Sequence, residues 1–155
     1  MYTYEEVIDK IENSRRFGNL PGVEVTRRML AALGNPQEGL RYIHVAGTNG
    51  KGSTCAFLNN IFTQAGLKCG CFTSPHLIHF EERITVGRLM ISKDAVTRIG
   101  NELLAMDFGV TPTMFDYCLV MALLYYKDCG CDVAVMETGL GGRLDSTNAL
   151  GNPMV

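Results

Sequence analysis

The sequence predicts an α/β fold in which a parallel sheet is covered by helices. Short apolar runs typical of buried strands lie at 41–47, 68–74 and 131–137, and the segments between them are long and rich in helical apolar spacing. Strands that are separated by helices imply right-handed crossovers, and such crossovers build a parallel sheet with both faces covered.

Length and composition indicate one soluble globular domain. The 155 residues are 46% apolar and 19% charged, which is enough to bury a sizeable core. The net charge is -2 and the basic residues are scattered as pairs, so we expect no nucleic acid partner. No apolar run is long enough to span a bilayer and no signal sequence follows Met1. We therefore expect a cytoplasmic protein without a membrane partner.

Six cysteines occur in this setting and are expected to be reduced, small apolar residues. Two C-x-C pairs, at 69–71 and 129–131, leave zinc binding as a less favoured alternative, because neither pair has the C-x-x-C spacing of a zinc knuckle.

Two helices are expected before the first strand. Thr3 and Glu6 have the spacing of a capping box, and apolar residues recur at helical intervals to residue 11. After a polar loop at 19–22, a second helical pattern runs from Val25 until Gly34 and Pro36 stop it.

The remaining elements follow from similar patterns. A helix is expected at 53–66, a hairpin at 83–91 about Gly87, and a helix after the cap residue Ser92. The segment 114–127 is apolar nearly all round, as a helix covered on several sides would be.

The stretch "HVAGTNGKGSTC" at 44–55 predicts an anion site. A strand, a tight glycine turn and a helix start leave several N–H groups aimed at one point, with the positive end of the helix dipole behind them. Gly47, Gly50 and Gly52 allow the backbone to close around phosphate oxygens, and Lys51 adds a positive charge for the outer phosphates. Further donors come from Thr48, Asn49, Ser53 and Thr54.

This turn differs from the generic phosphate-loop expression. That expression would need a glycine at Val45 and a hydroxyl residue at Gly52, whereas the hydroxyl here is displaced to Ser53. An ordinary kinase or GTPase is therefore not expected. The alternative to a phosphate site is a glycine turn with a structural role only.

Glu137 stands at the carboxyl end of a β-branched apolar run, directly before a glycine-rich loop. Open α/β sheets bind their ligands at this edge, so an acid beside a phosphate turn is a candidate metal ligand. The alternative is a solvated strand end.

Three motifs in order resemble a known family: "HVAGTNGKGST" at 44–54, "TSPHL" at 73–77 followed by "ERI", and "ETGLGGRLDSTN" at 137–148. Together they are similar to folylpolyglutamate synthase and dihydrofolate synthase, in the Mur ligase superfamily. The glycine between Lys51 and Ser53 is the variant typical of the folate branch. Two departures are Thr138, where valine is common, and Asp116, where glutamate is usual.

The resemblance implies an ATP-dependent ligase that adds glutamate to folate or dihydropteroate through an acyl phosphate, with ATP and Mg²⁺ as cofactors. It implies that Lys51 and Glu137 are catalytic and that Ser74 and Glu137 hold the metal. The ATP phosphates would be bound by Thr48, Asn49, Gly50, Lys51, Gly52, Ser53 and Thr54.

The resemblance also implies a folate or pterin site formed by Thr113, Met114, Phe115, Asp116 and Leu144. Thr113 and Asp116 are equally well spaced as a helix cap, and Ser74 before Pro75 is also ordinary turn chemistry. The loop at 19–21 is a further candidate wall of this pocket.

Family members are longer than this chain. The resemblance therefore implies that 1–155 is the amino-terminal part of a Mur ligase-like ATP-binding domain, incomplete at the carboxyl end and without the carboxyl-terminal domain. Such a chain is expected to bind nucleotide without completing catalysis, and the full enzyme is expected to be monomeric with small-molecule substrates. Another Mur-type amide ligase and a non-catalytic nucleotide-binding module remain as alternatives.

Overall fold

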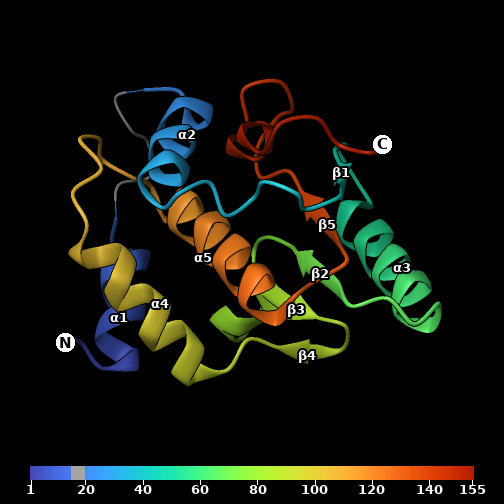
Figure 1. The fold of residues 1–155 in the computed structure, drawn as a ribbon, viewed down its shortest axis with the longest axis horizontal. Coiled ribbons are helices and arrows are strands. Elements are labelled where there is room, and N and C mark those ends of the chain that lie inside the picture. Colours follow the sequence, from blue (N-terminus) through green and yellow to red (C-terminus); the bar gives the residue numbers. More distant parts are fainter. Residues whose placement is uncertain (15–19) are drawn as a thin grey trace.

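The computed structural model describes residues 1–14 and 20–155 and shows a sheet with helices on both faces (Figure 1). None of the helices in this part of the chain is long and apolar enough to cross a bilayer. The arginine pair at 15–16 and the first residue of the loop predicted at 19–22 lie outside the described residues. The elements are α1 (Tyr4–Glu12), α2 (Gly22–Ala32), β1 (Tyr42–Val45), α3 (Lys51–Gln64), β2 (Cys69–Phe72), η1 (Phe80–Arg83), β3 (Ile84–Val86), β4 (Leu89–Met90), α4 (Lys93–Ala105), α5 (Met114–Cys129), β5 (Val133–Glu137) and η2 (Ser146–Leu150).

The sheet has the order β1-β5-β2-β3-β4. Strands β1, β5 and β2 are parallel, with Val45 opposite Glu137 and Phe72 opposite Met136. The α/β class is confirmed, but only these three strands are parallel. The hairpin β3-β4 extends the same sheet antiparallel, because the η1 connection between β2 and β3 is too short for a crossover helix.

Side chains alternate between two cores along β5. Val133 and Val135 pack with Cys55 on the face that α3 covers, whereas Ala134 and Met136 pack on the face that α5 covers. Helix α5 also contacts α1, α2 and α4. These helices account for its apolar pattern, which is confirmed as that of a helix covered on several sides.

The cysteines at 69 and 71 point to the α3 face because they are two residues apart on a strand. Both are buried free thiols, and burial raises the pKa of Cys69 to about 11.

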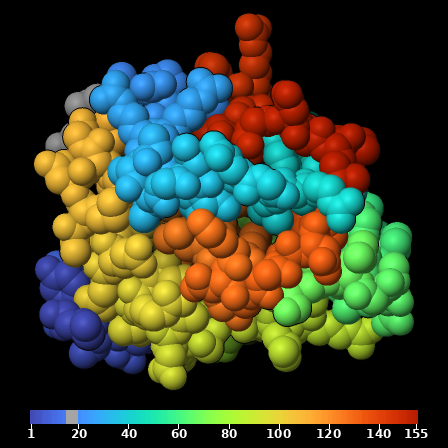
Figure 2. Space-filling model, viewed as in Figure 1, coloured from blue at the N-terminus to red at the C-terminus, as the bar shows by residue number. Residues whose placement is uncertain are grey.

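The order of the parallel strands decides where the site forms. Because β5 lies between β1 and β2, the loops that leave the carboxyl ends of all three strands meet at one edge of the sheet. Segment η2 after β5 also packs against α2, so the red carboxyl-terminal part and the lighter blue helix α2 lie side by side (Figures 1 and 2).

Candidate nucleotide and substrate site

The glycine turn lies between β1 and α3, and it is exposed from 46 to 50. Helix α3 begins at Lys51, two residues before the predicted start, because Gly50 takes a left-handed conformation (φ 77°) that ends the turn there. No side chain caps this helix. Lys51 Nζ donates to the Gly47 carbonyl oxygen at 3.0 Å and closes the turn. The result is a helix start whose N–H groups are open to an anion.

The predicted phosphate-binding residues are exposed or half-buried, but some of their side chains already have hydrogen-bond partners within the turn. Thr48 and Asn49 are exposed within the turn, and Gly52 and Ser53 are exposed in the first helical turn. The Thr54 hydroxyl instead donates to the Gly50 carbonyl oxygen at 2.9 Å. Thr54 therefore stabilises the helix start in this conformation.

Glu137 and Ser74 come from neighbouring strands and meet. Glu137 is only 4% exposed at the end of β5, and its Oε2 accepts the Ser74 N–H at 2.9 Å. Both residues line one cavity of about 470 Å³ together with Gly52 of α3. The two predicted metal ligands thus share a cavity with the uncapped helix start.

The lining of this cavity suits a cation. Glu82 and Glu137 are its acidic residues, and no described lining residue is basic. A buried carboxylate without a cationic partner is costly, and a hard divalent cation with oxygen ligands would offset that cost. The donor set therefore fits Mg²⁺.

A second cavity of about 350 Å³ gathers the predicted substrate residues. Leu20 and Pro21, the described residues of the loop predicted at 19–21, form one wall, and the predicted substrate residues in the lining are Thr113, Phe115, Asp116 and Leu144. Met114 lines a neighbouring cavity of about 310 Å³, which also contains Thr113, Phe115 and Ser74. The second cavity shares Thr113 and Phe115 with this neighbouring cavity, which in turn shares Ser74 with the cavity of the predicted metal ligands.

Asp116 belongs to the capping box of α5 and also lines this second cavity. It is fully buried, and its Oδ2 accepts the Thr113 N–H at 2.9 Å and the Thr113 hydroxyl at 2.7 Å. Its Oδ1 accepts the hydroxyls of Thr26 at 2.8 Å and Ser146 at 2.7 Å. Of the two roles left open by the sequence, the helix-cap role is present in the structure, with four donors on the carboxylate, and the substrate role stays a prediction for a residue that lines the cavity.

A polar network around Asp145, in the loop after β5, was not predicted from the sequence. Asp145 Oδ2 accepts the N–H groups of Gly139 at 2.9 Å and Leu140 at 3.1 Å, and Oδ1 accepts from the backbone and hydroxyl of Thr147. His44 Nε2 lies 2.6 Å from the same hydroxyl. The Asp-x-Thr spacing could have indicated the local bonds, whereas no sequence pattern indicates the contact of His44 with a residue 103 positions away.

The environment of His44 favours the neutral form of its ring. Burial lowers its pKa, and the Coulombic attraction of Asp145 opposes that effect in part. Because the Thr147 hydroxyl donates to Asp145, it accepts from His44, and the proton of the neutral ring must be on Nε2.

Comparisons with known proteins identify relatives along nearly the whole chain. No protein-family model matches it. The chain is 40% identical over 159 residues to the dihydrofolate synthase/folylpolyglutamate synthase of Bacillus subtilis, a match that covers 97% of this chain and 37% of that protein.

Two solved structures extend the likeness to the fold. A folylpolyglutamate synthase in complex with AMPPCP and folate has a TM-score of 0.87 at 35% identity, covering 95% of this chain and 38% of that one. A bifunctional folylpolyglutamate synthase/dihydrofolate synthase with Mn, AMPPNP and L-glutamate bound has a TM-score of 0.85 at 30% identity, covering 96% and 36%.

The fold, the uncapped glycine turn and the buried acid beside it define an α/β unit of the Mur ligase type. The chain belongs to the folylpolyglutamate synthase/dihydrofolate synthase family. It spans 19% to 37% of the length of the first curated relatives that it matches.

Proposed function

We propose that this chain supplies the phosphate and metal part of the active site of an ATP-dependent ligase that adds glutamate to folate or dihydropteroate. The observation that carries the proposal is the buried carboxylate of Glu137, which shares a cavity with the uncapped start of α3 and has no basic neighbour among the described lining residues. Relatives with ATP analogues, folate, Mn and L-glutamate bound support it.

The phosphate groups of ATP occupy the N–H groups at the turn of residues 48–54, and Lys51 turns from the Gly47 carbonyl oxygen toward the outer phosphates. Ser74 and Glu137 hold Mg²⁺, which neutralises charge on the transferring phosphoryl group. Lys51 and Glu137 are therefore the catalytic residues of this part of the site.

The chemistry requires phosphoryl transfer because a carboxylate is a poor electrophile with a poor leaving group. The substrate carboxylate attacks the γ-phosphorus of ATP and displaces ADP, which gives an acyl phosphate. The amino group of glutamate then attacks the acyl carbon, loses a proton and displaces phosphate. Residues of the chain exclude water meanwhile, since the acyl phosphate would otherwise hydrolyse.

The folate or pterin ring binds in the 350 Å³ cavity, against Phe115 and between Thr113 and Leu144. Met114 and Phe115 then guide the rest of the substrate past the neighbouring cavity toward Ser74. Asp116 acts from below by holding α2, α5 and η2 together.

The proposal extends to the whole protein. The chain is the amino-terminal part of a Mur ligase-like ATP-binding domain. Segments equivalent to those that the relatives carry beyond the matched region complete the catalytic site. The complete enzyme works as a monomer in the cytoplasm on small-molecule substrates.

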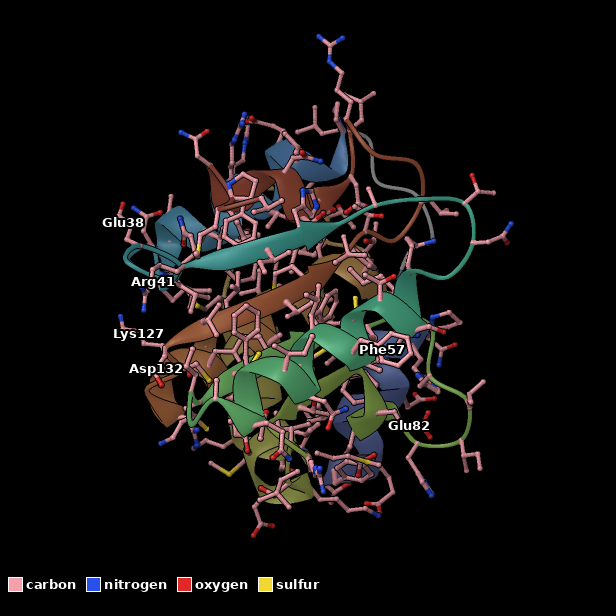
Figure 3. The ribbon with its side chains drawn as sticks, turned by 90° about the vertical axis from the view of Figure 1, so that its right-hand side faces the viewer. Glu38, Arg41, Phe57, Glu82, Lys127 and Asp132 are labelled. Carbon is pink, nitrogen blue, oxygen red and sulfur yellow. The ribbon has the colours of Figure 1, made fainter. Side chains whose placement is uncertain are left out.

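Calorimetry with ATP and Mg²⁺ tests the phosphate site. Lys51→Ala should weaken binding about tenfold, or ~1.4 kcal/mol, because it removes a charge-assisted contact. Lys127→Ala is the matched control, because Lys127 is exposed and lies on the other side of the view from the start of α3 and Phe57 (Figure 3). Equal affinities of wild type and Lys51→Ala would refute the phosphate role of the turn.

A further inference from the structure

The loop from Thr73 to His79 carries Ser74 but is not held by apolar burial. Leu77 is 90% exposed and Ile78 is 79% exposed at its tip. The Thr73 N–H donates to the Arg83 carbonyl oxygen at 3.0 Å, so the ends of the loop and η1 are joined. Something other than a hydrophobic core must fix the conformation of the residues between them.

The side chain of Glu82 provides that hold. Its Oε2 accepts the Leu77 N–H at 2.7 Å, and its Oε1 accepts the N–H groups of Ile78 at 3.0 Å and His79 at 2.8 Å. These bonds lower the pKa of the Glu82 carboxyl, which is ionised at neutral pH. Three charge-assisted bonds from one carboxylate make this a strong anchor for an exposed loop.

A second contact from η1 reaches the same loop. Arg83 is buried, and its Nε donates to His76 Nδ1 at 2.8 Å. The loop is therefore held at 76 by Arg83 and at 77–79 by Glu82, directly after the segment in which Ser74 donates to Glu137. Figure 3 shows Glu82 beside this loop, on the side of the molecule that also carries Phe57 of α3.

We propose that Glu82 is a positioning residue for the metal site: by binding three backbone N–H groups it keeps Ser74 beside Glu137, without being a metal ligand itself. The proposal rests on the proposed function, in which Ser74 and Glu137 hold Mg²⁺. Both oxygens of Glu82 are occupied by N–H donors, which distinguishes its role from that of Glu137, although the two acids line the same cavity.

Two variants separate the bonds of Glu82 to Leu77 and Ile78, which anchor the loop, from its bond to the His79 N–H, which caps the start of η1. Glu82→Gln replaces one acceptor oxygen by a donor that faces N–H groups. Glu82→Asp is one methylene shorter. Glu82 and Asp116 each lie three residues after the residue that caps their helix, and Asp116 accepts the N–H of its cap residue Thr113 at 2.9 Å, so an aspartate can make this bond. Glu82→Asp should therefore keep the bond to His79 and lose those to Leu77 and Ile78.

The test measures ADP binding by calorimetry with Mg²⁺ and again with EDTA. We expect both variants to bind ADP about tenfold or more weakly with Mg²⁺, the size of loss typical when a residue that orients metal ligands is removed. With EDTA their affinities should equal that of the wild type, because the glycine turn is intact. Amide exchange at Leu77 and Ile78 should be faster in both variants. Glu38→Gln, exposed on the opposite side in Figure 3, is the control.

The outcomes are distinct. Variants that retain the Mg²⁺-dependent affinity of the wild type would overturn the role of Glu82 and leave the proposed function standing. An equal loss with and without Mg²⁺ would also overturn it, since the effect would then be on the general fold. A wild type whose ADP affinity does not depend on Mg²⁺ would overturn both this inference and the proposed function.

Discussion

At the scale of single residues, the candidate site contains two buried acids that differ in how many hydrogen-bond donors surround their carboxylates. Glu137 is buried with one N–H donor, from Ser74, and no cation among the described lining residues. Asp116 is buried with four donors. A carboxylate that is left short of partners suits a metal ligand, whereas a fully satisfied one suits a structural role.

Glu137→Gln should therefore abolish stabilisation by Mg²⁺ and cost the metal-free protein little. The amide keeps an acceptor for the Ser74 N–H but lacks the charge that holds the cation. In the wild type, millimolar Mg²⁺ should raise the melting temperature by mass action, and in the variant it should not. Thermal unfolding with Mg²⁺ and with EDTA measures both effects. A large drop in the melting temperature of the metal-free variant would make Glu137 a structural residue instead.

His44 should make stability depend on pH. Burial lowers the pKa of its ring in the folded state, so the unfolded state binds a proton more readily. Its contribution is present in full above the unfolded pKa of about 6.5 and is lost as the pH falls below that value. His44→Gln, which can still donate to Thr147, should flatten the fall in unfolding free energy between pH 7 and 5.5. Urea denaturation across this range provides the comparison, and parallel curves would contradict it.

At the scale of elements, the sequence predicts what spacing controls locally. The capping box of Thr3 and Glu6, the hairpin about Gly87 and the covered helix α5 all follow from patterns within a few residues, and all are confirmed. The insertion of β5 between β1 and β2 does not follow from such patterns, nor does the contact of Thr26 with Asp116 across 90 positions. Residue types identified the candidate ligands, but only tertiary structure shows which of their atoms are already occupied.

The junction of α2, α5 and η2 should be sensitive to Asp116. Asp116→Ala leaves the buried hydroxyls of Thr26 and Ser146 without their acceptor, and it removes the aspartate half of the α5 capping box, which accepts the Thr113 N–H. We expect a loss of about 3 kcal/mol or more in unfolding free energy. Ser146→Ala, which removes one donor and leaves Asp116 in place, should cost only about 1 kcal/mol. Similar losses for the two variants in urea denaturation would show that Asp116 is not the central residue of this junction.

At the scale of the whole molecule, three parallel strands bring the glycine turn, the proposed metal ligands and the 350 Å³ cavity to one side of the sheet. The glycine turn follows β1, Ser74 follows β2, and the loop with Leu144 follows β5. In the proposed function, binding of a nucleotide needs only the first two of these. The complete reaction also needs a site for glutamate, and the relatives with ATP analogues bound are more than twice as long as this chain, which covers 38% and 36% of them.

The chain of 155 residues should therefore bind nucleotide without ligating glutamate. Incubation with ATP, Mg²⁺, glutamate and either dihydropteroate or tetrahydrofolate should yield no product detectable by mass spectrometry, even when the ATP concentration is high enough to saturate the protein. The physical reason is that catalysis depends on holding the acyl phosphate and the amine within about 3.5 Å of each other, and loss of one binding site forfeits that orientation. Lys51→Ala provides the background for the assay, since it removes the proposed phosphate contact but leaves the cavity of Phe115 intact. Multiple-turnover product above this background would show that these residues suffice for the whole reaction, and the glutamate site would then have to be sought among them.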